Sequence, residues 1–96
     1  VGADTPVRTY PRPVQAELPV WLTALSPATF RAAGANGFHV LTMMLGCTPA
    51  ELAERTAAYR DARRAAGLDP AGGQVTLMLH TYVDPDAARA ESLVRE

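Results

Sequence analysis

The chain has 96 residues and a mass of 10.2 kDa, so it forms one domain or part of one. Its 48% hydrophobic and 20% charged residues are ordinary for a folded protein and exclude a disordered chain. The net charge of −1 excludes the broad positive field of a non-specific nucleic-acid binder, and no apolar run reaches the ~20 residues of a membrane span. The single cysteine excludes an internal disulfide and a structural zinc site, and we predict a cytoplasmic protein.

Residues 1–19 predict an extended, proline-rich lead-in to a domain that covers residues 20–96. Prolines recur in this lead-in, where they remove backbone donors and favour extended conformations in the residues before them. The apolar run at residues 20–25 predicts a first strand. Ser26-Pro27 then predicts a helix start, because serine caps free N–H groups and proline fits the first helical position. This helix should end near Asn36-Gly37.

The same pattern of strand and capped helix repeats twice more. Residues 38–45 predict a second strand, and Thr48-Pro49-Ala50-Glu51 is a capping box that should open a helix reaching Ala66. Residues 74–83 predict a third strand. Asp84-Pro85 repeats the signal of a cap followed by proline, and so predicts a last helix over residues 85–95.

This order of elements predicts an α/β fold with a parallel sheet, because nearly apolar strands each precede a helix. A typical eight-fold barrel uses about 31 residues per unit, so the chain would supply three consecutive βα units of a (β/α)8 barrel. A doubly wound open sheet is the main rival. In both folds ligands bind at the carboxyl ends of the strands. We therefore expect any site to use the loops at residues 25–27, 45–48 and 81–84.

Ser26 is the strongest candidate for contact with a ligand. Its hydroxyl, with the N–H groups of Ala28 and Thr29 and the positive end of the helix dipole, would make a small anion site. On the residues alone, simple capping of the helix is the interpretation that we favour.

Three further side chains are predicted near the carboxyl ends of the strands, on the sheet face opposite the helices. They are Thr23, Thr42 and His80, and a hydrogen bond to a threonine is the simpler role for the histidine. His39 begins its strand, at the structural end of the sheet. Cys47 is most simply a small filler before the second helix.

The remaining polar residues indicate no reaction. Arg60, Arg63 and Arg64 are expected on a solvated outer face of the second helix. The sequence contains no paired carboxylates, no metal-ligand spacing and no nucleophile elbow, so catalytic residues and metal ligands are not predicted.

An ordered series of segments runs along the chain: RTYPRPVQ at 8–15, LPVWLTA at 18–24, SPATFRAAG at 26–34 and VTLMLHT at 75–81. With Val40-Leu41-Thr42 and a helix over residues 51–67, the series resembles the luciferase-like flavin monooxygenases. It is most similar to the FMN-dependent subgroup associated with polyketide and non-ribosomal peptide synthases. The resemblance implies the C-terminal half of a (β/α)8 barrel, which would use reduced FMN and O2 to oxidise a small or carrier-bound organic substrate.

The resemblance also implies site residues. Thr23, Ala24 and Ser26 match the strand end that lies near the flavin phosphate in relatives. Thr42 and His80 become candidate residues of the pocket lining.

Three βα units cannot enclose a flavin, so we expect FMN to bind only in a complete barrel. The implied partners are the rest of the barrel or synthase polypeptide, a flavin reductase and a carrier protein, with a homo-oligomer as an alternative; neither nucleic acid nor a membrane is expected. Relatives carry a histidine where Met43 or Met44 stands. This difference leaves a second hypothesis open, a non-catalytic barrel remnant that acts as a spacer or interaction segment in a multidomain biosynthetic synthase.

Overall fold

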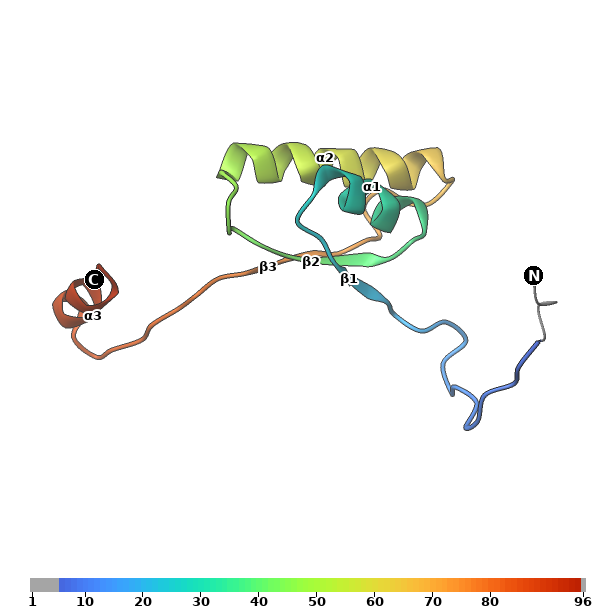
Figure 1. Cartoon of the computed structure of the whole chain (residues 1–96), viewed down its shortest axis with the longest axis horizontal. Coiled ribbons are helices and arrows are strands. Elements are labelled where there is room, and N and C mark those ends of the chain that lie inside the picture. The colour runs from blue at the N-terminus through green and yellow to red at the C-terminus, as the bar shows by residue number, and fades with distance from the viewer. Residues whose placement is uncertain (1–5, 96) are drawn as a thin grey trace, which may run out of the picture.

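The computed structural model describes residues 6–95, which form a three-stranded parallel sheet with helices on one face (Figure 1). The strands, which lie side by side in chain order, are β1 (Trp21–Thr23), β2 (His39–Met43) and β3 (Val75–Met78). The helices are α1 (Pro27–Ala35), α2 (Pro49–Ala65) and α3 (Ala87–Val94). The predicted α/β fold of three consecutive βα units is confirmed.

The central strand β2 decides which side chains face the helices. Val40 pairs with Leu22 of β1 and with Val75 of β3. Val40 is fully buried, and both of its partners pack against the same core. Because successive side chains of a strand point to opposite faces, Leu41 and its neighbours in register face away from the helices.

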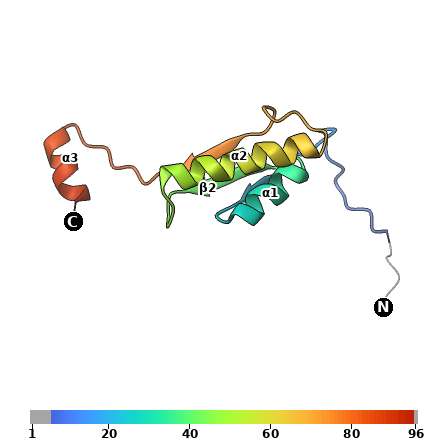
Figure 2. The ribbon, with the colours of Figure 1, turned by 90° about the horizontal axis from the view of Figure 1, so that it is seen from above.

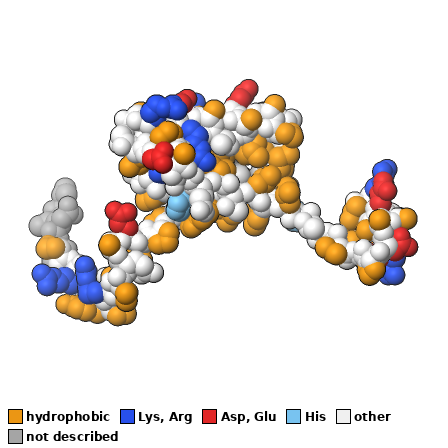
Figure 3. Space-filling model, turned by 180° about the vertical axis from the view of Figure 1, so that it is seen from behind, with side chains coloured by type: hydrophobic (Ala, Val, Ile, Leu, Met, Phe, Trp, Pro, Cys, Tyr) orange, Lys and Arg blue, Asp and Glu red, His pale blue; other side chains and the backbone are white. Residues whose placement is uncertain are grey.

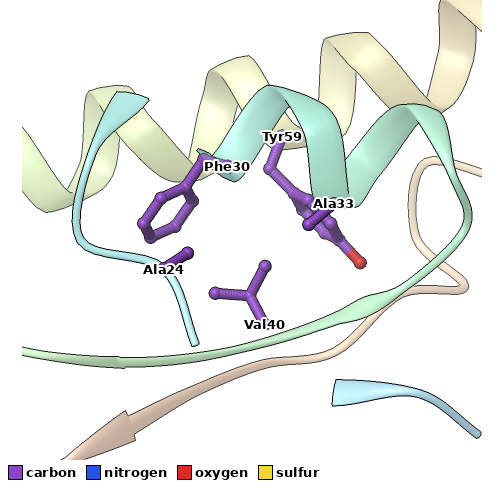
Figure 4. Close-up of a cluster of buried hydrophobic side chains, with 5 residues drawn as sticks. All are labelled: Ala24, Phe30, Ala33, Val40 and Tyr59. Carbon is purple, nitrogen blue, oxygen red and sulfur yellow. The ribbon is translucent and has the colours of Figure 1, made fainter. Parts of the chain in front are cut away.

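The core lies between the sheet and the two helices α1 and α2 (Figure 4). Its fully buried side chains are Ala24, Phe30, Ala33, Val40 and Tyr59. Tyr59 reaches down from α2, and its hydroxyl donates to the backbone carbonyl of Phe38 at 2.8 Å. The polar end of this buried tyrosine is therefore hydrogen-bonded. We call the sheet together with α1 and α2 the body.

Both helices of the body begin where the sequence predicts. Ser26 caps α1 by accepting the N–H of Thr29 at 3.2 Å, and Thr48 and Glu51 form the predicted capping box of α2. These starts depend on side chains within one turn of the chain, so the local sequence is sufficient to specify them.

The arginines of α2 correct one prediction. Arg60 donates to two backbone carbonyls of the loop at residues 68–74, at 2.7 and 2.5 Å, and Arg63 donates to a third at 2.9 Å. Arg63 is 7% exposed, and only Arg64 of the three has the expected solvated position. The loop carbonyls have no strand partners, so the two guanidinium groups supply the donors that these carbonyls need.

The third strand is shorter than the sequence predicts. β3 ends at Met78, which pairs with the last residue of β2, Met43. Beyond this point no described strand offers a hydrogen-bonding partner, so residues 79–86 form an extended arm that leads to α3 (Figure 2).

The last helix begins later than predicted, at Ala87 rather than at Pro85. Its cap is Asp86, whose Oδ1 accepts the N–H groups of Ala88 and Arg89 at 2.9 and 3.3 Å. Asp84, the predicted cap, instead accepts the N–H of Asp86 at 2.8 Å. A local turn of this kind competes with capping, because the aspartate side chain can bond only nearby donors.

Residues 6–19 of the lead-in and the arm to α3 extend from opposite sides of the body (Figures 1 and 2). The radius of gyration is 18.8 Å, whereas a compact chain of this length would have about 13 Å. Hydrophobic side chains gather on the body and along both extensions (Figure 3), and α3 buries none of its own. No helix within residues 6–95 is long and apolar enough to cross a membrane.

Candidate functional site

The carboxyl ends of the three strands meet at one edge of the sheet, because the strands are parallel. The β1–α1 loop, the β2–α2 loop and the arm at residues 79–86 all leave from this edge. Ligands of α/β folds bind at such an edge. The candidate site is therefore built around the β1–α1 loop, where Ser26 lies.

Ser26 has extended backbone angles, φ −96° and ψ 150°, and stands as the cap of α1. Its Oγ accepts the N–H of Thr29 and lies 2.8 Å from the Thr29 hydroxyl oxygen. Pro27 has no N–H, and the N–H of Ala28 is too near the helix start to find a carbonyl four residues back. Of the two N–H groups predicted to be free, that of Thr29 is already bonded and that of Ala28 remains.

These groups suit an organic phosphate. The Ala28 N–H, the two hydroxyls and the positive end of the helix dipole are all at the start of α1. The first turn of α1 contains no acidic residue that would repel an anion. The donor set therefore fits a phosphate, and it contains nothing that would recognise an aromatic ring system.

The two other residues predicted beside the phosphate have different surroundings. Thr23 pairs in register with Leu41, is exposed and lies on the helix-free face, near Ser26 in the chain. Ala24 is fully buried in the core, and its N–H donates to the Leu41 carbonyl at 2.9 Å. The side chain of Ala24 therefore packs in the core beneath the β1–α1 loop, whereas the side chain of Thr23 is accessible to a ligand.

The sequence predicts that Thr42 faces away from the helices, and this prediction is wrong. Thr42 is 1% exposed and lies two residues from Val40, so the two side chains point to the same, helix-covered face. The register explains the error, because Thr23 lies opposite Leu41 rather than Thr42. The residues of β2 that face away from the helices are His39, Leu41 and Met43.

His80 lies on the arm, beyond the last paired residue of β3, and its side chain is exposed. No sheet register fixes it relative to Thr23 or Ser26. His39 is at the opposite end of the sheet, as predicted, where its Nδ1 accepts the N–H of Gln74 at 3.1 Å. Cys47 is half-buried, with its Sγ 3.8 Å from the Met43 carbonyl oxygen.

Arg55 also belongs to this edge, although the sequence does not predict it there. It projects from α2, and its Nη1 donates to the backbone carbonyl of Leu25 at 2.5 Å, directly before Ser26. A contact between residues so far apart in the chain leaves no periodic signal. The one local hint is its spacing from Glu51, which places both side chains on the same face of the helix.

Two hollows lie on the body. A groove of about 220 Å³ beside the β1–α1 loop is lined by Pro27, Arg31, Glu51, Glu54, Arg55 and Ala58. A larger pocket of about 780 Å³ lies at the amino-terminal ends of the strands, between the lead-in and the turn before β2. The larger pocket is at the wrong end of the sheet for an α/β ligand site, so its size does not make it the candidate.

Glu51 gives the β2–α2 loop a dependence on pH. Its Oε2 accepts the backbone N–H of Thr48 at 2.7 Å and the Thr48 hydroxyl at 2.9 Å. These two bonds, with a smaller effect from the positive charge of Arg55, hold the pKa of Glu51 below its ordinary value of 4.5. The folded state therefore favours the ionised carboxylate.

We expect the Glu51 capping contribution to be fully present above the unfolded pKa and to be lost as the pH falls through the lower, folded pKa. Urea unfolding between pH 7 and pH 3 should show a smaller acid-induced loss of stability in Glu51→Gln than in the wild type. Glu54→Gln, one turn along the helix and outside the capping box, is the control. Parallel pH curves for the wild type and Glu51→Gln would contradict the assignment.

A family model described as luciferase-like monooxygenase matches residues 3–96, nearly the whole chain. No curated protein matches the chain. Among the residues that the structure describes, no group of three or more His, Cys, Asp or Glu side chains could hold a metal ion.

Proposed function

The chain belongs to the luciferase-like monooxygenase family, and on that premise we propose that it forms one wall of an FMN-binding (β/α)8 barrel. The barrel would oxidise a small or carrier-bound organic substrate with O2. The observation that carries the proposal is the start of α1, whose first turn has free donors and no acidic residue and lies at the carboxyl edge of a parallel sheet. The family supports a monooxygenase; the choice of FMN rests on this fit to a phosphate.

The start of α1 and the helix-free face of the sheet have separate functions in this proposal. Ser26, the Ala28 N–H and the helix dipole bind the phosphate and so hold the cofactor in one position. The helix-free face carries Thr23, Leu41, Met43 and Met78, none of them charged, which would keep water from the reacting groups. Bound reduced flavin supplies the electrons that activate O2, and the protein orients it.

Three strands leave the sheet open at both edges, whereas a barrel of this kind has eight strands. We propose that the other strands come from further residues of the same barrel or synthase polypeptide, and that FMN binds only when the barrel is complete. A flavin reductase would supply the reduced cofactor, and a carrier protein would present a tethered substrate.

Substitutions of Ser26 test the phosphate contact in the complete barrel. Ser26→Ala should lower stability by about 1 kcal/mol through the lost cap, and FMN affinity roughly tenfold through one lost bond to a charged group. Ser26→Asp separates the two roles, because aspartate caps a helix as well as serine does but repels a phosphate. We expect it to keep the stability and to lose FMN affinity more severely than Ser26→Ala.

The measurements are FMN titration by fluorescence quenching and urea unfolding of each variant. Ser92→Ala on α3 provides the same substitution at a distance from the site. If Ser26→Asp binds FMN as tightly as the wild type, the serine is only a cap and the proposed phosphate site is wrong.

A further inference from the structure

Arg55 connects α2 to the loop that carries the proposed phosphate site. Its Nη1 donates to the backbone carbonyl of Leu25 at 2.5 Å, a contact across 30 positions of the chain. Arg55 also lines the groove beside this loop, together with Pro27 and Glu51. A guanidinium has five N–H donors in a rigid plane, which suits it to hold a carbonyl in one direction.

This contact fixes the direction of a neighbouring donor. In a trans peptide unit the carbonyl oxygen and the N–H of the next residue point in opposite directions. Because Arg55 holds the Leu25 carbonyl toward α2, the N–H of Ser26 must point away from α2. Ser26 itself is an exposed residue.

The two ends of the loop are held as well. The N–H of Ala24 donates to the Leu41 carbonyl at 2.9 Å, and the Ser26 carbonyl accepts the N–H of Phe30 at 3.1 Å. The Leu25 carbonyl lies between these two anchors and is held by a side chain alone. Loss of Arg55 would therefore free the one peptide unit whose rotation changes the direction of the Ser26 N–H.

We propose that Arg55 is a positioning residue for the phosphate of the flavin, acting through the Leu25–Ser26 peptide unit to aim the Ser26 N–H at it. This inference rests on the proposed function. It adds a second backbone donor, the Ser26 N–H, to that of Ala28, and it assigns a role to the long-range contact between Arg55 and the Leu25 carbonyl.

The test compares FMN with riboflavin, which lacks the phosphate, in the complete barrel protein. A positioning role at the phosphate predicts that Arg55→Gln weakens FMN binding roughly tenfold, the size of one hydrogen bond to a charged group, and leaves riboflavin binding within twofold. Arg64→Gln is the matched control, since Arg64 is on the same helix but is exposed beside Asp61. We expect it to change neither affinity.

Three outcomes would overturn the inference. Unchanged FMN affinity in Arg55→Gln would show that the Leu25 contact does not matter to the phosphate. Equal losses for FMN and riboflavin would show a role in the fold alone. A wild-type protein with no preference for FMN over riboflavin would overturn the proposed phosphate site itself, and with it the role of Arg55. If Arg55→Gln does not fold, Arg55→Lys is tested in its place. We expect its FMN affinity to fall about threefold, because the lysine ammonium keeps the charge but lacks the planar donors of arginine.

Discussion

Replacement of Phe30 by alanine should remove about 3–5 kcal/mol from the free energy of unfolding, most of what so small a domain has. The Phe30 side chain is fully buried and lies between α1 and the sheet, above Ala24 and Val40 (Figure 4). Truncation leaves a cavity, because α1 packs closely against α2 at Gly34 and Tyr59 and cannot collapse freely onto the sheet. We expect urea unfolding to lose its cooperative transition, or to shift to a much lower midpoint.

Leu45→Ala is the control for Phe30→Ala, because it truncates a large aliphatic side chain that is 64% exposed. A change within about 0.5 kcal/mol is expected there. Similar small effects of the two substitutions would show that α1 is not held against the sheet through Phe30, and that the described core does not stabilise the body.

Elements specified by neighbouring residues could be predicted from the sequence. The bounds of α1 agree with the prediction because Ser26-Pro27 starts the helix and Asn36 ends it, with Gly37 taking the positive φ of 75° that follows. The order of strands and helices followed from the same kind of signal, since each strand precedes a capped helix.

Features that depend on distant partners could not be predicted in this way. The end of β3 is set by the end of β2, and the positions of Arg60 and Arg63 are set by carbonyls of a loop that they reach only in the fold. The face of Thr42 depends on which residue of β2 lies opposite Thr23, and a shift of one residue reverses it.

The candidate site shows the same division. The position of Ser26 as the cap of α1 could be predicted, because a cap depends only on residues within one turn. Arg55 could not, because its partner Leu25 precedes a different helix. The contact that holds the β1–α1 loop from α2 therefore needed the structure, whereas the cap of α1 was already visible in the sequence.

Gly34→Ala should destabilise the body by about 1–3 kcal/mol, although alanine is the better helix former by about 1 kcal/mol. Gly34 lies in α1 where that helix crosses α2, and it is buried. A Cβ at this position would overlap the Tyr59 carbonyl oxygen and lie 3.0 Å from the Cβ of Ala62. Since the closest atom belongs to the backbone of α2, no side-chain rotation relieves the overlap, and the two helices must separate.

Gly72→Ala is the matched control for this effect. A Cβ at Gly72 would meet mainly side-chain atoms of Asp69 and Arg63, the nearest at 3.2 Å, and these can shift. We expect its urea midpoint to stay within about 0.5 kcal/mol of the wild type. If Gly34→Ala instead gains the stability that helix propensity alone gives, α1 and α2 do not pack as closely as described. The packing of α1 against α2 sets the position of Ser26 relative to Arg55. A loss of stability in Gly34→Ala, with no loss in Gly72→Ala, would therefore support the geometry on which the proposed phosphate site rests.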